Sequence, residues 1–463
     1  MTADPDSPKK NRSWLWTVLG MAGVVVLFLG IAAPFYLQDE SPPEDGDLRV
    51  RDPVVPAEQN GLVQMRNLPG GLVDFVQFAG KEGVKEEEAQ DIFAGVKTND
   101  ELVDKFLVQA QPAFEKLDEV LQLPHFAFND DISPTTLLPE ISIMIKYARI
   151  LRISASRHQA LGDYPSAVHD VELMRLLARR LSEGYKPLVQ VLTACSVNGM
   201  ARKTAQDLFD DPALPAASTS ALTQEFGREI SWPRSMQRSI NVESLLLVNA
   251  LDMVKQGRTT PMALAGSKSP AVPFINLSFR ENETKQAAID FYRDLRQSLG
   301  RPYSASKTTA FTGVQSYVGN TSSVQYWLRP NLAGRSILGI LTPSFDRLAD
   351  MMYTQTAADR LLLIEGAVRQ YFDAHHALPA TLNDLVPDFL PAIPHDPFND
   401  KPLLYDATRG VIYSVGTSLK DMGGSSYLKT TLSTPRDGDS LTDQTQPSLQ
   451  LRFQSAPPTK PAN

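Results

Sequence analysis

The chain has 463 residues, with 45 lysines and arginines, 53 aspartates and glutamates and one cysteine. Its formal charge of -8 argues against non-specific nucleic-acid binding, which needs a basic surface to displace the counterions of phosphate. The lone Cys195 excludes an internal disulfide and any metal site built on several cysteines. Hydrophobic residues make up 42% of the chain, which is ordinary for a folded protein, and the length suggests two or three domains.

An uncharged apolar segment lies close to the N-terminus. The 24 residues from Trp14 to Leu37 carry no charged side chain. As a helix rising about 1.5 Å per residue they span about 36 Å, which is enough to cross a hydrocarbon core of about 30 Å. Aromatic residues at both ends suit the two membrane interfaces. We therefore predict a single transmembrane helix at residues 14–37, with the lipid bilayer as a partner of the protein.

The charges on either side of this segment predict its orientation. Lys9, Lys10 and Arg12 precede it, and a run of acids follows from Asp39 onward. The positive-inside rule then places residues 1–13 in the cytoplasm and the rest of the chain across the membrane. This describes a single-pass protein of the bacterial inner (cytoplasmic) membrane with a periplasmic, extracytoplasmic body. The alternative is a cleaved signal peptide, but its apolar core is normally only about 7–15 residues long, so an uncleaved signal-anchor is favoured.

The extracytoplasmic part is predicted to begin with a stalk and to continue as helices. Residues 38–56 are rich in proline and acids and predict a flexible stalk. Residues 57–342 predict an irregular helical array, and their loops at 257–273 and 300–323 are either lids over a pocket or plain connectors. Pro112 should kink or split the first of four helices, which we expect near 99–121, 139–161, 166–183 and 187–209.

The clearest local motif of the helical region is the string Ala160-Leu-Gly-Asp-Tyr-Pro-Ser-Ala167. Gly162 is expected in the left-handed conformation that ends a helix, and Asp163 or Ser166 is expected to cap the next one, with Pro165 in its first turn. The string is similar to the turn of tetratricopeptide-type helical hairpins. The full repeat signature of about 34 residues does not recur, so we do not predict a regular solenoid.

Two features of the following helices have structural interpretations. Cys195 lies in an apolar helical run and is predicted to be a buried packing residue and not a nucleophile. Arg175, Arg179 and Arg180 are predicted to form a solvated helix face and not an anion site. The same region carries His158 and His169 around the Gly162 turn, where we expect them at the surface.

From residue 343 the pattern becomes that of a small α+β module. Apolar residues recur at helical spacing within a long helix predicted over 344–376. Two short antiparallel strands are predicted at 402–405 and 411–415, so that residues 343–430 form a helix packed on a small sheet. Residues 431–463 are rich in threonine, serine, proline and glutamine and are predicted to be a disordered tail.

This module resembles a known family. The order helix, Leu-Pro, Leu-x-x-Leu, Pro-x-Asp-Pro-Phe, Leu-x-Tyr and Tyr-Ser-Val-Gly, over about 344–424, is similar to the globular domain of the major pseudopilin of type II secretion. In that family an acidic calcium-binding loop follows the last motif. Here Ser418 stands where the family usually has an aspartate, which leaves Asp421 as the only nearby carboxylate, so we predict no calcium site. The prepilin cleavage site is also missing, so assembly into a pseudopilus is not expected.

A second resemblance covers most of the chain. The anchor, the helical body, the string Arg329-Pro-Asn-Leu-Ala-Gly-Arg335 and the C-terminal module resemble a large set of uncharacterised membrane-anchored helical proteins of planctomycete- and verrucomicrobia-type bacteria. The resemblance implies an architecture and no activity.

A search for catalytic motifs finds no nucleophile elbow, zinc-protease motif, phosphate loop or dinucleotide fingerprint. His375 and His376, with His395 and Asp396 nearby, are the most tempting cluster. Adjacent histidines on a helix point about 100° apart and seldom bind one metal, and Asp396 before a proline is first of all a turn signal. We therefore predict no catalytic, cofactor-binding or metal-binding residue.

These observations favour a membrane-anchored extracytoplasmic binding or scaffold protein of the bacterial envelope. Its expected partners are other envelope proteins, with no cofactor and no nucleic acid. One alternative is a membrane-anchored hydrolase with its site near His375 and His395. Another is an accessory component of a type II secretion-like system, for which the pseudopilin-like module is the only warrant.

Overall fold

The structure is a computed structural model. It describes residues 30, 38–68, 74–93, 97, 99–128, 133, 136, 138–260, 279–306, 315–319, 329–341, 348–424 and 447–452. Among these residues, no helix is both long enough and apolar enough to cross a membrane. The predicted cytoplasmic tail and, apart from Gly30, the predicted anchor at 14–37 lie outside the described residues, as do large parts of the two predicted loops.

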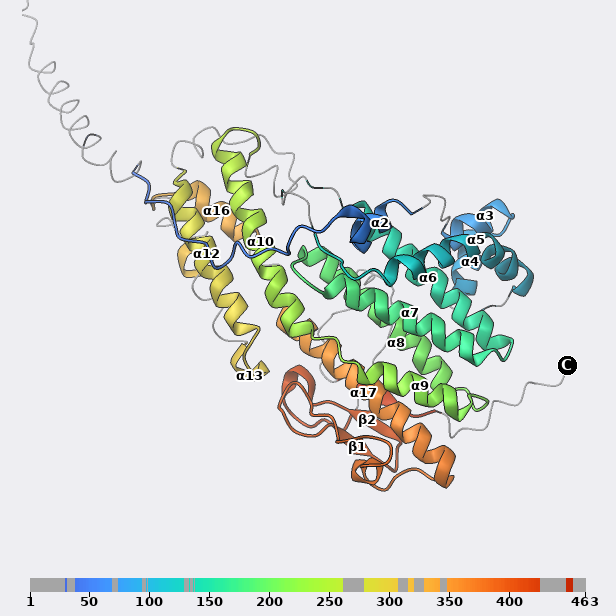
Figure 1. Ribbon diagram of the computed structural model, residues 1–463. Coiled ribbons are helices and arrows are strands. Elements are labelled where there is room, and N and C mark those ends of the chain that lie inside the picture. The colour runs from blue at the N-terminus through green and yellow to red at the C-terminus, as the bar shows by residue number, and fades with distance from the viewer. Residues whose placement is uncertain are drawn as a thin grey trace, which may run out of the picture. The chain divides into compact units, whose positions relative to one another are not determined.

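The described chain is mainly helical, as predicted, and its one small antiparallel sheet has three strands where two were predicted (Figure 1). It divides into two compact units, of which the larger takes its residues from 46–246, 291–311 and 345–463, and the smaller from 1–45, 247–290 and 312–344. The helices are η1 (Ala57–Gln59), α2 (Gly61–Arg66), α3 (Phe75–Lys81), α4 (Glu86–Phe93), α5 (Asp100–Leu121), α6 (Pro139–Ala160), α7 (Tyr164–Ser182), α8 (Leu188–Phe209), α9 (Ala216–Gly227), α10 (Trp232–Lys255), α12 (Glu281–Ser298), α13 (Tyr303–Ser306), α16 (Leu332–Leu341), α17 (Leu348–His375), η4 (Leu382–Leu385) and η5 (Gly416–Ser418). The strands are β1 (Leu404–Asp406), β2 (Val411–Tyr413) and β3 (Ser448–Gln450).

Helices α5 to α8 lie close to the four predicted positions, but α5 does not split at its proline. The helix runs through Pro112 without ending. A proline inside a helix removes the hydrogen bond to the carbonyl four residues earlier, here that of Val108. The Val108 side chain is 76% exposed, so the freed carbonyl lies on the solvent face of the helix, where water can satisfy it.

The turn between α6 and α7 confirms the prediction from its motif. Gly162 has a φ of 74°, the left-handed value that a residue with a Cβ adopts only at a cost. Of the two candidate caps, Asp163 is the one used, because its side chain accepts a hydrogen bond from the Ser166 N–H at 3.3 Å. Pro165 lies in the first turn of α7. The two helices therefore meet as an antiparallel hairpin at the predicted place.

A buried charge cluster joins α7, α8 and α17 in the larger unit. Arg175 is fully buried, and its guanidinium lies 3.2 Å from the Asp359 carboxylate. Asp359 also accepts hydrogen bonds from Arg202 at 2.9 Å and from the Asn198 amide at 2.8 Å. The prediction that Arg175 belongs to a solvated helix face is therefore wrong. Its helix is covered on that side by α9, whose Glu225 pairs with Arg179 at 2.7 Å.

The acid-rich segment after the predicted anchor makes specific contacts with the larger unit from Asp47 onward. Asp47 pairs with Arg293 at 2.7 Å and with Arg296 at 2.8 Å. Further along, Asp52 accepts a hydrogen bond at 3.3 Å from Lys186, whose side chain is fully buried. This part of the predicted stalk is therefore held by ion pairs to the helical body.

The C-terminal part of the larger unit contains the predicted long helix and two predicted strands, with a third strand added. Helix α17 packs on α8 and α9, and the sheet has the order β1-β2-β3. Strand β3 comes from the region predicted to be a disordered tail, so that prediction is wrong for residues 447–452. Leu449 and Leu451 are buried there, and Leu449 lies opposite Ile412 of β2.

In the smaller unit, the string Arg329–Arg335 forms a compact structural motif around Asn331. Asn331 is fully buried with a φ of 55°, and its amide donates to the Arg280 carbonyl at 3.1 Å and to Thr284 Oγ1 at 2.8 Å. Its carbonyl oxygen accepts from the Gly334 N–H at 3.2 Å. A Cβ on Gly334 would lie 1.9 Å from Thr284 Oγ1, so only glycine fits. These residues serve the packing of α16 on α12.

Candidate functional site

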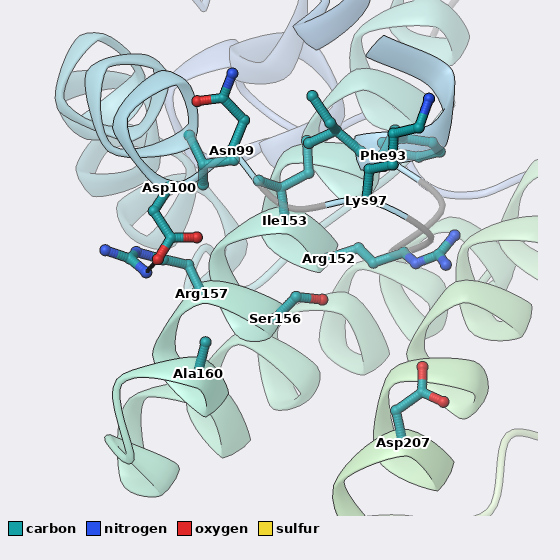
Figure 2. A pocket seen from close by; sticks show the side chains of 12 residues that line it. Phe93, Lys97, Asn99, Asp100, Arg152, Ile153, Ser156, Arg157, Ala160 and Asp207 are labelled. Carbon is teal, nitrogen blue, oxygen red and sulfur yellow. Dashed lines mark hydrogen bonds and ion pairs between the residues drawn. The ribbon is translucent and has the colours of Figure 1, made fainter. Parts of the chain in front are cut away.

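A pocket of about 130 Å³ opens in the larger unit between the end of α4, the start of α5 and the middle of α6 (Figure 2). Helix α8 contributes Asp207 to its rim. The apolar part of the lining consists of Ile92, Phe93, Val103, Ile153 and Ala160. Phe93 ends α4, and Ile153 packs into the buried aromatic cluster formed by α3 and α5. The wall of the pocket is thus built on the packed core of these helices.

The unusual residue of the pocket is Arg152 of α6. Its guanidinium lies over the Phe93 ring, with Cζ 5.3 Å from the ring centroid. Within the part of the chain that the structure describes, it makes no hydrogen bond and no ion pair. Burial lowers the pKa of Arg152, and the negative charge of Asp207 opposes that effect. A half-buried guanidinium carries five N–H donors, and no acceptor among the described residues takes one of them here.

The other cations of the lining already have acidic partners. Lys97 pairs with Asp91 at 2.8 Å. Arg157 pairs with Asp100 at 2.6 Å and with Asp104 at 2.7 Å. Figure 2 shows the Asp100–Arg157 pair on one side of the pocket, while the Arg152 side chain extends to the other side, where Asp207 lies. Among the described residues, Arg152 is therefore the lining cation without an acidic partner.

Two polar groups accompany Arg152. Ser156 lies one helical turn further along α6, on the same face of the helix, and its hydroxyl has no partner among the described residues. Asp207 is held by Lys203, which lies one turn earlier on α8 and donates a hydrogen bond to its Oδ1. The pocket thus offers a guanidinium and a hydroxyl on one helix, with a carboxylate opposite, around an apolar floor.

The histidines singled out in the sequence have separate structural environments. The His375 ring stacks on Tyr371 at 4.3 Å and lies against Phe389 at 6.2 Å. His376 is exposed with a φ of 54°, just after the last residue of α17. His395 pairs with the exposed Asp400 at 3.3 Å. No group of three or more histidine, cysteine, aspartate or glutamate side chains in the described ranges is placed to hold a metal ion.

Asp396 is a structural residue of the turn that precedes the sheet. It is 1% exposed, and its carboxylate accepts hydrogen bonds from the Phe398 N–H at 3.0 Å, the Val415 N–H at 2.7 Å and the Ser414 hydroxyl at 2.9 Å. The prediction of a turn at Asp396 is confirmed. Because its oxygens accept these three hydrogen bonds, the Asp396 carboxylate connects the turn to the residues that follow β2.

Cys195 is buried in α8, as predicted. Burial raises the pKa of its thiol to about 12. A thiol with that pKa is protonated at neutral pH and a poor nucleophile.

Sequence reasoning missed Phe93 and Arg152. Arg152 falls inside a helix that was predicted correctly, but it stands 59 positions after Phe93 in the numbering, and no spacing rule joins the two. The only local signal is the pair Arg152 and Ser156, four residues apart, which places a cation and a hydroxyl on one helix face. That pattern is too common to identify a site.

No protein-family model matches the chain, and neither a curated protein nor a solved structure shows detectable similarity to it. The resemblance of residues 344–424 to the pseudopilin domain therefore stays a prediction. The interpretation of the pocket depends on its own geometry.

Proposed function

We propose that the protein is a membrane-anchored, extracytoplasmic binding protein of the bacterial envelope, which takes a small ligand into the pocket around Arg152. The observation that carries the binding role is the half-buried Arg152 guanidinium, stacked on Phe93 and without an acceptor among the described residues. The location is inferred from the apolar segment at 14–37 and the charges around it. The described residues contain no arrangement that would favour catalysis over binding.

The location is tested by fractionating cells that produce the full chain. We expect it in the membrane fraction after an alkaline wash, and we expect protease added to spheroplasts to digest the part after residue 38. A variant without residues 2–37 should move to the soluble fraction. Recovery of the full chain in the soluble fraction would contradict the proposed anchor.

The binding role is tested with the detergent-solubilised full chain and a library of small neutral, cationic and anionic fragments, followed by ligand-observed NMR. Ser156→Trp introduces a large side chain at an exposed position on the pocket wall and should abolish binding. Ser196→Trp, at an exposed position of α8, is the matched control and should not affect it. If no fragment distinguishes the two variants, the pocket is not a binding site.

A further inference from the structure

The charges of the pocket restrict what it can bind, and this step rests on the proposed function. Three cations line it, namely Lys97, Arg152 and Arg157, and two acids, Asp100 and Asp207. Lys97 and Arg157 are paired with acids, and Asp207 is paired with Lys203. Arg152 is left as the lining cation that has no direct acidic partner among the described residues. Burial of an anion against this guanidinium would compensate the desolvation that lowers its pKa.

The position of Asp207 favours a ligand with a single negative charge. Its carboxylate is close enough to Arg152 to influence the pKa of the guanidinium, yet it makes no ion pair with it among the described contacts. An anion bound to Arg152 would therefore be repelled by the nearby negative charge of Asp207. A second negative charge on the same group, as in a phosphate monoester, would add repulsion without a second free cation to offset it. A planar carboxylate matches the guanidinium fork with two parallel hydrogen bonds.

The size and lining of the pocket restrict the rest of the ligand. A cavity of about 150 Å³ lined by apolar side chains accommodates benzene, and the volume here is about 130 Å³. Phe93 and Ile153 provide apolar surface beside the Arg152 guanidinium. The space therefore suits one ring or one branched aliphatic group directly attached to the charged end.

We propose that this pocket binds a monocarboxylate whose apolar body is about the size of one ring, with the carboxylate on Arg152 and Ser156 and the body against Phe93 and Ile153. Two sources share this chemistry: a free aromatic or branched-chain acid, and the C-terminal residue of a peptide that ends in a large apolar side chain.

The test uses the detergent-solubilised full chain and isothermal titration calorimetry with benzoate, benzamide, benzylamine and phenyl phosphate. We expect benzoate to bind at least 10 times more tightly than the other three. A short peptide ending in phenylalanine with a free carboxylate, compared with its C-terminal amide, then separates the two sources: tighter binding of the free peptide than of benzoate identifies a peptide end, and the reverse identifies a free acid.

Substitutions show whether Arg152 is the residue responsible. Arg152→Gln should weaken benzoate binding roughly 10- to 100-fold, the loss expected when a hydrogen bond to a charged group is removed, and Arg152→Lys should weaken it less. Arg149→Gln is the matched control, because Arg149 also lies over Phe93, at 5.9 Å, but is paired with Asp74. It should leave binding unchanged. Unchanged thermal unfolding of each variant would exclude a folding defect.

The two proposals fail in different ways. If benzamide, benzylamine or phenyl phosphate binds as tightly as benzoate, or if Arg149→Gln weakens binding as much as Arg152→Gln does, the ligand class is wrong while the pocket remains a binding site. If no probe of any charge binds, and no fragment of the library distinguishes Ser156→Trp from Ser196→Trp, the proposed binding function itself fails.

Discussion

Asp359 Oδ2 of α17 lies 3.2 Å from the Arg175 guanidinium of α7, in an ion pair whose side chains are 2% and 0% exposed. Burial by itself would raise the pKa of the Asp359 carboxyl, but Arg175 and Arg202 outweigh that effect and hold the pKa below its usual value. Trp232 Nε1–H donates a further hydrogen bond to the same carboxylate at 3.3 Å. The C-terminal helix is thus joined to the helical array through one buried carboxylate.

Replacing this carboxylate should destabilise the larger unit strongly. Asp359→Asn leaves the Arg175 charge buried with less compensation, and we expect a loss of about 3–5 kcal/mol in the free energy of unfolding. Urea denaturation followed by circular dichroism measures it. Asp406→Asn, which removes a partly buried partner of the exposed Arg409 side chain, is the control and should have a much smaller effect. Equal losses in the two variants would contradict this prediction.

Glu365 of α17 should make stability fall as the pH rises. Both its carboxylate oxygens are buried without a hydrogen-bond partner among the described residues. Burial, with Asp210 adding to it, raises the pKa of Glu365 well above its ordinary value of 4.5. The folded state therefore keeps a proton that the unfolded state releases above about pH 4.5, and stability decreases from that pH upward.

Glu365→Gln removes this titration and should be more stable than the wild type at pH 7, with the difference closing toward pH 4. Urea midpoints measured from pH 4 to pH 8 test it. Glu86→Gln, at an exposed position of α4, should show no such trend. A constant difference between Glu365→Gln and the wild type would contradict the assignment.

His158 should make the stability of the fold depend on pH near neutrality, because it pairs with Asp170 at 2.9 Å. The hydrogen bond that His158 donates to the Asp170 carboxylate raises the pKa of His158 above 6.5 in spite of partial burial. A raised folded-state pKa gives stability that is fully present below about pH 6.5 and is lost as the pH rises through the folded-state value. His158→Gln should therefore lose most stability, relative to the wild type, at pH 5–6.

Thermal melts of the wild type and His158→Gln between pH 5 and pH 9 check this dependence. His169→Gln provides the control, since the His169 side chain is 57% exposed and lies 3.8 Å from Glu172. The interpretation fails if the His158→Gln defect is the same at every pH in this range.

Strand β3 should contribute to the stability of the larger unit in spite of its short length. A chain ending at residue 446 loses the burial of Leu449 and Leu451, which are 6% and 4% exposed. With about 1.5–3 kcal/mol for each fully buried leucine, the loss should be about 3 kcal/mol or more. A chain ending at residue 452 keeps the strand and should unfold like the full chain. Equal urea midpoints for the two truncations would show that β3 adds nothing.

The helices that could be predicted share one property, which is that their signals are local. Apolar spacing located α5 to α8, and the Gly162 turn with the Asp163 cap followed from side-chain chemistry within a few residues. Strand β3 could not be predicted in this way. Its few residues stand in a polar region. They are ordered by pairing with β2, where Leu449 lies opposite Ile412, 37 positions earlier in the chain.

Local sequence signals are enough to predict the mainly helical class, the apolar segment at 14–37, the hairpin at Gly162 and the turn at Asp396, because each depends on neighbouring residues. Tertiary packing, by contrast, buries Arg175 against Asp359 and places Arg152 over Phe93 without an acceptor in the described chain. Both arginines lie inside long helices, Arg152 in α6 and Arg175 in α7, and the apolar spacing of the two helices does not distinguish their surroundings. Whether such a charge is neutralised inside the fold or left for a ligand depends on which distant side chain packs against it, and no local periodicity encodes that choice.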